Sequence, residues 1–421
     1  MSRFAITGAS LVLPTHVQPD GVVIVDGEKI VAAGARLATP IPRGTTRIDA
    51  RGGVVIPGLV DMHINGFGGV DVFDAGRADL ARMGAALAAR GVTSYVPTLP
   101  TSPFPSLCRA LAKLVGIVAT PAPAGCAEPL GVYVEGPFLS DAKRGAHPSQ
   151  DLRSPRAESV KQLMEVLGTK TRIVAIAPEL PGAIDAIRTF HRAGALVALA
   201  HTNADTATCA LAAAAGARHV SHLFNAMGAL HHRTPGLAGY TLGSNELTAE
   251  IIADGHHVDR FMVAMAWRAM GADRLALVSD AVAPAGTTLT DGQAVRLESG
   301  LGRVRIKRSG APGAVPRAET ANGTLAGSVA SLSECLRFAV REAGIPLADA
   351  VRMASTTPAR IAGAGSHKGR LETGFDADVV ILDAQLQPKQ VWVRGHAIEN
   401  GAPPVTGTRK APRQRPYARR R

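Results

Sequence analysis

The stretch AHTNADTATCALAAAAGARHVSHLFNAMGALHHRTPG, residues 200–236, decides the fold and much of the chemistry of this 421-residue chain. Side chains that suit metal or phosphate binding, such as His201, His222 and Arg233, stand there among short apolar runs. His201 directly follows the apolar run 195–200, and His222 closes a second, shorter run. A barrel enzyme presents its catalytic groups at the ends of its strands. The stretch therefore predicts a metal-dependent barrel enzyme.

The sequence on both sides of this stretch repeats a strand–helix pattern. Predicted strands lie at 94–99, 130–134, 173–177, 196–200, 219–223, 247–252 and 275–278, and predicted helices at 78–90, 105–118, 158–167, 183–193, 204–215, 331–342 and 348–362. Seven or eight strand–helix units favour an α/β fold closed into a (β/α)8 TIM-like barrel. A Gly- and Arg-rich segment at 288–317 interrupts the strand–helix pattern, and we interpret this segment as an inserted hairpin near the barrel mouth.

The two ends of the chain have a strand-rich sequence pattern without the alternating helices. Short β-branched runs punctuated by Gly and Pro fill residues 1–57, and strand-like text returns at 374–382 and 391–394. We expect these segments to form one small β-sandwich domain, with the barrel inserted between its halves. The predicted domains are 1–57 and 366–400 for the β-domain, 58–365 for the barrel, and 401–421 for a basic tail.

Composition limits the compartment and the class of protein. The four cysteines are scattered without a CxxC motif, which argues against a disulfide framework or a zinc-thiolate site and favours a reducing cytoplasm. We find no signal peptide and no run of 18 uninterrupted apolar residues, so we expect no membrane span.

The formal net charge of +12 invites a nucleic-acid interpretation, but its distribution weakens it. Residues 401–421 hold seven Lys and Arg and no acid, which leaves 12 − 7 = +5 for the preceding 400 residues. A Pro- and Arg-rich terminus with little apolar content predicts a solvated tail. A nucleic-acid partner is therefore not expected, although a polyanion contact of the tail stays open.

Three residues far apart in the sequence form the predicted metal site. Glu135 ends an apolar strand and precedes Gly-Pro, so its carboxylate projects at a strand terminus; taken alone it could equally be a loop charge or a helix cap. Together with His201 and His222 it makes one carboxylate and two imidazoles, a standard ligand set for a catalytic divalent ion with an open position for water. His219 lies three residues before His222 and on a strand points to the opposite side, so we exclude it as a ligand.

Two further segments carry candidate residues. Asp280 follows the apolar run 275–278 and precedes a Gly/Pro loop, where a carboxylate could take a proton from water and later deliver it to a leaving amine. His63 and Asn65 share one face of a predicted strand. Asn is a poorer ligand for zinc than imidazole, so we expect a second metal site there to be weak or absent.

Several motifs together resemble the N-acetylglucosamine-6-phosphate deacetylase family of the amidohydrolase superfamily. They run in order from about residue 54 to 383: PGLVDMHINGFGG, GVYVEGPFLSDAKRGAH, the stretch from AHTNADT to HHRTPGLAG, ADGHHVD, VSDAVAPAG, GTLAGSVASLSECLRFAV and ASTTPARIAG. The HLFNAM…HHRTPG and EGPF…RGAH signatures are specific to this family, whereas the DADVVILD ending is shared more widely.

The resemblance implies roles residue by residue. Glu135, His201 and His222 would hold one divalent metal per subunit, Zn²⁺ before Fe²⁺, and Asp280 would be the general base and acid. His147 would contact the substrate and help to polarise its amide carbonyl. The sugar phosphate would be bound by Asn225, the backbone of Ala226, Arg233 and His257, with part of this site supplied across a homodimer interface.

The expected function is metal-dependent hydrolysis of the acetamide of N-acetylglucosamine 6-phosphate to glucosamine 6-phosphate and acetate. One alternative keeps the reaction but takes N-acetylgalactosamine 6-phosphate or a related acetamido-sugar phosphate. A less favoured alternative is a catalytically inactive barrel with a nucleic-acid-binding basic tail, and it predicts salt-sensitive binding that the tail alone carries.

Overall fold

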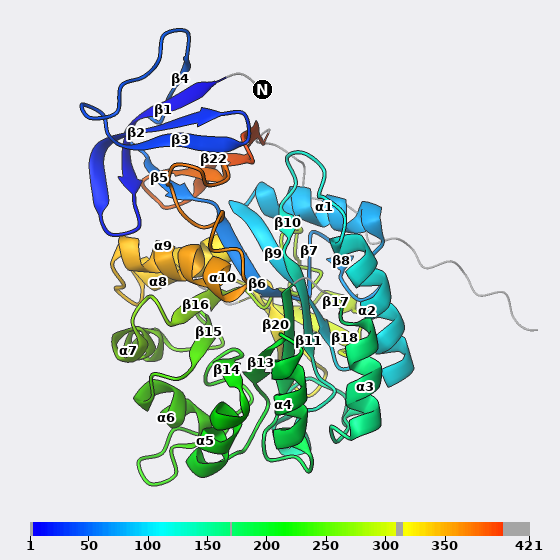
Figure 1. Ribbon diagram of the computed structural model, residues 1–421. Helices are drawn as coiled ribbons and strands as arrows, with labels where there is room; N and C mark the ends of the chain where they lie inside the picture. The colour runs from blue at the N-terminus through cyan, green and yellow to red at the C-terminus, as the bar shows by residue number, and fades with distance from the viewer. Residues whose placement is uncertain (1–2, 169–170, 309–314, 399–421) are drawn as a thin grey trace, which may run out of the picture.

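The computed structural model describes residues 3–168, 171–308 and 315–398, and its largest element is a barrel of parallel strands (Figure 1). The barrel strands, in order around the sheet, are β6 (Leu59–Ile64), β9 (Val92–Pro100), β11 (Gly131–Glu135), β12 (Thr171–Ile176), β13 (Leu196–Leu199), β14 (Ala217–Val220), β15 (Thr248–Ile252) and β16 (Leu275–Val278). The short β10 (Glu128–Pro129) also pairs with β9. All of these pairs are parallel, as strand–helix alternation requires.

The barrel closes where β6 meets the residues that follow β16. Ile64 forms a parallel bridge with Ala281, the Asp280 amide donates to the His63 carbonyl at 3.0 Å, and the Asn65 amide donates to the Ala281 carbonyl at 2.8 Å. The predicted (β/α)8 barrel is thereby confirmed, and its closing contacts involve the residues that flank Asp280.

Helices surround the barrel and cover its apolar outer face (Figure 1). They are α1 (Arg77–Ala88), α2 (Phe104–Val118), α3 (Ala157–Val166), α4 (Ala183–Arg192), α5 (Thr206–Ala215), α6 (Gly236–Gly243), α7 (Arg260–Met270), α8 (Leu332–Arg341), α9 (Leu347–Ala354) and α10 (Thr356–Ile361), with two 3-10 turns at Asp141–Lys143 and Ser149–Asp151. Local sequence sets their ends: Asp205 caps α5 by accepting from the Thr208 amide, and Ser331 with Glu334 forms a capping box on α8.

Both ends of the described chain build the β-domain, as predicted. Its eight strands are β1 (Phe4–Val12), β2 (Val17–Asp26), β3 (Lys29–Ala35), β4 (Thr46–Asp49), β5 (Val54–Pro57), β21 (Val379–Leu382), β22 (Pro388–Val393) and β23 (His396–Ala397). The antiparallel pairing of β5 with β21 joins the two halves, and Trp392 stacks on Phe4 within the apolar cluster. Figure 1 shows this domain packed at one end of the barrel.

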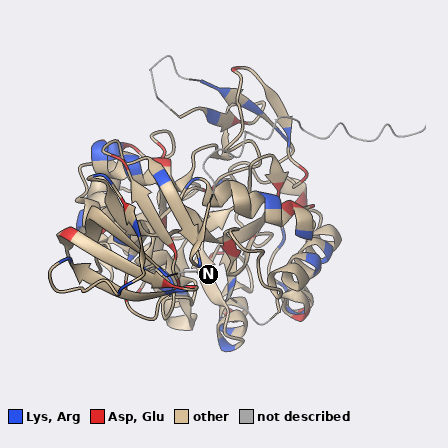
Figure 2. Ribbon diagram, turned by 90° about the horizontal axis from the view of Figure 1, so that it is seen from above, with Lys and Arg blue, Asp and Glu red and all other residues tan. Residues whose placement is uncertain are grey.

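The interruption at 288–317 is larger than the hairpin that we predicted. Four antiparallel strands form it, β17 (Ala294–Arg296), β18 (Arg303–Lys307), β19 (Arg317–Glu319) and β20 (Leu325–Ser328). Burial alternates strictly along β18, with Arg303, Arg305 and Lys307 exposed, so the sheet has one apolar and one basic face. Figure 2 shows it projecting from the body of the molecule. The short pair β7 (Gly66–Phe67) and β8 (Val70–Asp71) completes the strands of the described residues.

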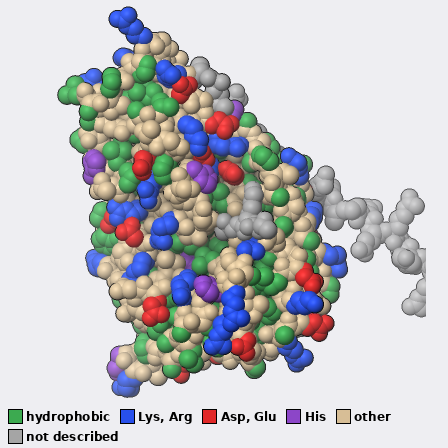
Figure 3. Space-filling view, viewed as in Figure 1, with side chains coloured by type: hydrophobic (Ala, Val, Ile, Leu, Met, Phe, Trp, Pro, Cys, Tyr) green, Lys and Arg blue, Asp and Glu red, His purple; other side chains and the backbone are tan. Residues whose placement is uncertain are grey.

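The surface of the described residues carries both charge signs. Basic and acidic side chains are interspersed with apolar ones on the face shown in Figure 3. None of the described helices is both long and apolar enough to cross a membrane. The predicted basic tail, 401–421, lies outside the described residues.

Candidate active site

The Glu135 carboxylate, at the end of β11, lies at the centre of a cluster of imidazoles from four other segments. Its Oε1 lies 2.8 Å from Nε2 of His222 and 3.1 Å from Nε2 of His201. Its Oε2 lies 3.4 Å from Nε2 of His63 and 3.8 Å from Nε2 of His147. All five side chains are buried. The three residues predicted as metal ligands therefore converge on one point at the carboxyl ends of the barrel strands.

The backbone at these strand ends is held in an uncommon conformation. His201, His222 and Asp280 have φ values of 45°, 29° and 49°, in the left-handed region that side chains with a Cβ seldom adopt. Such residues cost about 1–3 kcal/mol each and cluster at active sites, where the surrounding structure holds them. At His222 this turn ends β14 at Val220, three residues earlier than the predicted strand end.

Hydrogen bonds to the other ring nitrogen fix which nitrogen of His201 and of His63 faces Glu135. Nδ1 of His201 donates to the Lys143 carbonyl at 3.0 Å, and Nδ1 of His63 donates to Oε2 of Glu250 at 2.8 Å. In a neutral imidazole the opposite nitrogen then carries a lone pair. Metal-binding histidines use their second nitrogen in this way, to donate to a carbonyl or a carboxylate.

The donor set fits a divalent cation. Lone pairs that face a carboxylate oxygen repel it unless a proton or a cation lies between them. Ligands about 2.0–2.2 Å from a tetrahedral zinc ion stand roughly 3.4 Å apart. The nitrogens of His222 and His201 lie 2.8 and 3.1 Å from Oε1 of Glu135, so a bound ion would require each of them to move by less than about 1 Å. Nε2 of His63 and Nδ1 of His222 are buried without a hydrogen-bond partner. One carboxylate with imidazoles is the chemistry that zinc prefers in catalytic sites.

His147 has the opposite tautomer. Its Nδ1 accepts a hydrogen bond from the Thr101 amide at 3.3 Å, so a neutral ring carries its proton on Nε2. That nitrogen lies close enough to Glu135 and His201 to belong to a three-residue metal group. Because a protonated nitrogen has no lone pair for a metal, we assign His147 as a hydrogen-bond donor. The contact of His147 to a substrate carbonyl stays a prediction.

Asp280 lies at the edge of the cluster and is its most accessible carboxylate. Oδ1 of Asp280 is 3.6 Å from Nε2 of His63 and accepts a hydrogen bond of 2.7 Å from Nδ2 of Asn65. The Ser328 amide donates to the Asp280 carbonyl at 2.9 Å. A Cβ on the neighbouring Gly327, whose φ is 60°, would lie 2.7 Å from the Asp280 carbonyl oxygen, so glycine permits this approach.

Asn65 thus holds Asp280 through its amide nitrogen, a contact that the sequence did not suggest. His63 is grouped with Glu135 and Asp280 as a possible ion-binding set, and Asn65 is not part of that group. The second metal site that we predicted at His63 and Asn65 stays a prediction.

Burial and charge set the protonation of the site residues in the metal-free protein. Burial tends to raise the pKa of Glu135, but His63 and the other imidazoles hold it well below its ordinary value. Burial, helped by His147, lowers the pKa of His201 to about 4, so this ring is neutral at pH 7, as a metal ligand must be. Burial also raises the pKa of Asp280, which brings this carboxyl nearer to the range useful for proton transfer.

The predicted phosphate-site residues lie beside this cluster and at the surface. His257 is buried, and its Nδ1 donates to Asp254 at 2.8 Å. Burial tends to lower the pKa of His257, but Asp254 and then Asp280 raise it. Asn225 is partly buried and donates to the His222 carbonyl at 3.3 Å, and Ala226 has a φ of 51°. Arg233 is exposed, 2.9 Å from Nε2 of His232, so within one chain it does not reach into the cluster.

Two carboxylates that hydrogen-bond to histidines of the site were not predicted from the sequence. Glu250, in the interior of β15, bonds to His63 and to His219, and Asp254 accepts from His257 and from the Ser328 hydroxyl at 2.9 Å. A signal existed for Glu250, because one acid interrupts the apolar run TAEII. His219 binds Glu250 and Thr248, which agrees with its exclusion as a metal ligand.

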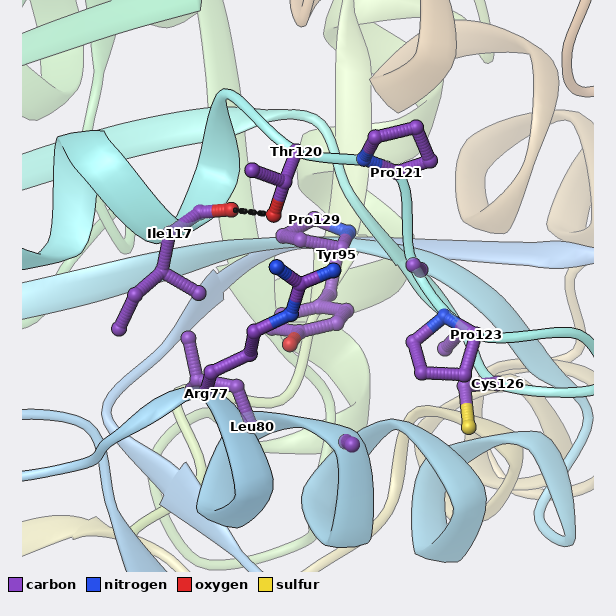
Figure 4. Close-up of a pocket in the computed structure, with 12 residues that line it drawn as sticks. Arg77, Leu80, Tyr95, Ile117, Thr120, Pro121, Pro123, Cys126 and Pro129 are labelled. Carbon is purple, nitrogen blue, oxygen red and sulfur yellow. Dashed lines mark hydrogen bonds between the residues drawn. The ribbon is translucent and has the colours of Figure 1, made fainter.

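A surface pocket with about 310 Å³ of space, open to solvent, lies elsewhere, between α1 and the segment 117–129 (Figure 4). Tyr95 of β9 lines it, together with Arg77 and Cys126. Glu135 pairs with Pro100, five residues further along β9 than Tyr95. The pocket is therefore remote from the imidazole cluster and takes no part in its chemistry.

Comparison with known proteins agrees with this geometry. Residues 54–408 match the amidohydrolase family. The chain belongs to the amidohydrolase family. Among curated members, the N-acetylglucosamine-6-phosphate deacetylase of Vibrio furnissii is 35% identical over 392 residues, covering 91% of this chain and 92% of the relative. The N-acetylgalactosamine-6-phosphate deacetylase of Escherichia coli O157:H7 is 34% identical over 361 residues, covering 85% and 90%.

Solved structures of this amidohydrolase group have the same fold. The N-acetylglucosamine-6-phosphate deacetylase of Pasteurella multocida superposes with a TM-score of 0.84 at 28% identity and covers 94% of this chain and 99% of that one. A variant of the Mycobacterium smegmatis deacetylase, solved with N-acetyl-D-glucosamine-6-phosphate, gives 0.84 at 31% identity and covers 94% and 100%. The predicted family resemblance and the barrel with a β-domain are confirmed.

Proposed function

We propose that this amidohydrolase removes the acetyl group of N-acetylglucosamine 6-phosphate and releases glucosamine 6-phosphate and acetate. The observation that carries the proposal is the convergence of His201 and His222 on Glu135, with Asp280 beside them. The relatives named above support the substrate, because proteins about one-third identical to this chain over most of its length carry that activity in their names.

Glu135, His201 and His222 would hold one divalent ion per subunit. Zn²⁺ is the favoured ion and Fe²⁺ the alternative, and a second ion at His63 and Asn65 would bind more weakly or not at all. Such an ion supplies Lewis acidity, which lowers the pKa of water and polarises a carbonyl oxygen. The family is metal-dependent, and the clusters of buried His and acid side chains fit that requirement.

Side chains of this chain would supply proton transfer and stabilise the charge that develops in the transition state. Asp280, held by Asn65, takes a proton from the attacking water and later delivers it to the nitrogen of the leaving amine. His147 donates from Nε2 to the acetamide oxygen, where negative charge develops in the transition state. Burial of the cluster excludes bulk water and strengthens both interactions.

The phosphate would be bound at the rim of the site. Asn225, the Ala226 backbone and His257 lie next to His222 or are coupled to it electrostatically. Arg233 is exposed on a loop with the half-exposed Leu230, and we propose that this loop meets a second copy of the chain in a homodimer that completes the phosphate site. Guanidinium groups bind phosphate with paired hydrogen bonds, which suits such a role.

A second candidate substrate is N-acetylgalactosamine 6-phosphate, favoured by the relative of that specificity in Escherichia coli O157:H7. The two sugars differ at C4. The four cysteines, all free in the structure, support a reducing compartment, and we propose the cytoplasm.

Acetate release tests the function directly. Purified protein of known metal content is assayed with both sugar phosphates, and kcat/KM is compared between the epimers and with unphosphorylated N-acetylglucosamine. We expect the 6-phosphate of N-acetylglucosamine to give the highest kcat/KM. Absence of acetate release from either phosphate by zinc-loaded protein would refute the proposal.

A further inference from the structure

Glu250 is a carboxylate in the middle of strand β15, with no exposed surface. Oε2 of Glu250 accepts from Nδ1 of His63 at 2.8 Å and from the backbone amide of His222 at 3.4 Å. Its Oε1 accepts from Nε2 of His219 at 3.0 Å. One side chain thus joins β6, β14 and the turn that carries a predicted metal ligand.

The fold alone does not account for an acid at this place. A carboxylate without solvent is costly unless it is paired and hydrogen-bonded, and an apolar side chain of similar size is often no less stable there. Glu250 meets that requirement, because its two oxygens accept from His63, from His219 and from the His222 amide. The cost of this buried acid points to a role in the neighbouring site rather than in the stability of the fold.

The bond to His63 determines what that ring presents to the site. Oε2 of Glu250 also accepts from the backbone amide of His222, so it acts as an acceptor, and Nδ1 of His63 is the donor in their shared bond. Nε2 then turns toward Glu135 at 3.4 Å and Asp280 at 3.6 Å, and it has no hydrogen-bond partner. Without Glu250 the ring could rotate or exchange its tautomer, and Nε2 would no longer be held toward Glu135 and Asp280.

We propose that Glu250 is a positioning residue of the metal site. It fixes the orientation and tautomer of His63 between Glu135 and Asp280, and through the His222 amide it ties this arrangement to the turn that holds His222. Glu250 acts on the ion and the substrate only through these residues. The inference rests on the proposed metal-dependent function but names a residue outside its ligand and catalytic set.

The test compares two variants of the full chain, Glu250→Gln and the matched control His219→Gln. Gln at 250 keeps the size of the side chain but replaces one accepting oxygen by an NH₂ group, so it cannot accept from both imidazoles. Gln at 219 keeps a nitrogen donor toward Oε1 and leaves the Glu250–His63 bond in place. For each protein we would measure Tm, the Zn²⁺ dissociation constant by chelator competition, the visible spectrum with Co²⁺, and kcat and KM.

Glu250→Gln should raise the Zn²⁺ dissociation constant about 10–100-fold, as loss of such supporting bonds does elsewhere. It should also change the Co²⁺ spectrum and lower kcat more than it changes KM. His219→Gln should leave the dissociation constant and the spectrum close to those of the wild type, whatever its Tm. Unchanged zinc affinity in Glu250→Gln, or an equal loss in His219→Gln, would overturn the proposal.

Two safeguards keep the result interpretable. If Glu250→Gln does not melt cooperatively, Glu250→Asp replaces it, because the shorter carboxylate cannot reach both histidines and should weaken zinc binding in the same way. Zinc affinity and the Co²⁺ spectrum need no sugar substrate. A failure of the proposed deacetylase activity in the wild type is therefore distinguishable from a failure of the role assigned to Glu250.

Discussion

Replacing Asp280 by asparagine isolates the proton-transfer step. The side chain keeps its size, and the carbonyl oxygen of the introduced amide can still accept the 2.7 Å hydrogen bond from Asn65. The backbone bonds to His63 and Ser328 are unaffected, so the barrel should still close. The amide cannot take a proton from water. Loss of general acid–base catalysis typically costs about 10²–10⁴ in rate, which corresponds to about 2.7–5.4 kcal/mol in activation free energy.

We therefore expect kcat of Asp280→Asn to fall about 10²–10⁴-fold, with KM and zinc content near those of the wild type. The assay is acetate release under saturating N-acetylglucosamine 6-phosphate, with metal content determined on the same sample. Asp185→Asn, the same chemical change on the exposed face of α4, is the control and should be fully active. A kcat for Asp280→Asn close to that of the wild type would remove Asp280 from its assigned role.

Three other outcomes follow from the structure. Removing the metal with a chelator should abolish acetate release. Zinc at 100 times its Kd should restore acetate release and raise the free energy of unfolding by about 2.7 kcal/mol. A chelated protein with full activity would contradict the metal assignment. Arg233→Ala should raise KM for the phosphorylated sugar more than for N-acetylglucosamine itself and should also weaken self-association in sedimentation experiments; an equal effect on both sugars would argue against phosphate binding. Lys368 is buried, with Nζ 2.9–3.0 Å from Asp376, Asp378 and Glu128, so Lys368→Met should cost about 3–5 kcal/mol at pH 7 because the carboxylates lose their cation. Burial tends to raise the pKa of Asp376, but Lys368 lowers it, so the ion pair stabilises the fold above the ordinary pKa of Asp and loses this contribution as the pH falls through the lowered pKa. The difference in denaturant midpoint between the wild type and Lys368→Met should therefore become smaller toward pH 3. A difference in midpoint that does not change with pH would refute the charge argument.

Strand ends account for what could be predicted from the sequence. Glu135, His201 and Asp280 each follow an apolar run, and parallel strands bring their carboxyl ends to one edge, so their convergence needed no coordinates. The two-residue repeat by which we excluded His219 does not extend to His222, because β14 ends at Val220. The bonds of His219 to Glu250 and Thr248 support the exclusion instead. The domain boundaries at residues 57 and 365 stay a prediction.

The rest depends on contacts between segments distant in sequence. The sequence indicates only a weak metal ligand at Asn65, because nothing local shows that its amide contacts Asp280, 215 positions away. Glu250 was overlooked because strand interiors are expected to be apolar, and its partners His63 and His219 lie on other strands. The insert was underestimated because strands of three to five residues, such as β17 and β19, leave a weak periodic signal.

The bonds that close the barrel make activity a reporter of correct assembly. Ala281 pairs with both β6 and β20, and Asp280 shares its amide and carbonyl with the same two neighbours. In a molecule whose first and last strands are unpaired, or are paired with a register shift of one residue, Asp280, the proposed proton carrier, is misplaced. Partly assembled chains should thus lack the proposed deacetylase activity, and specific activity would report the fraction of molecules with a closed barrel.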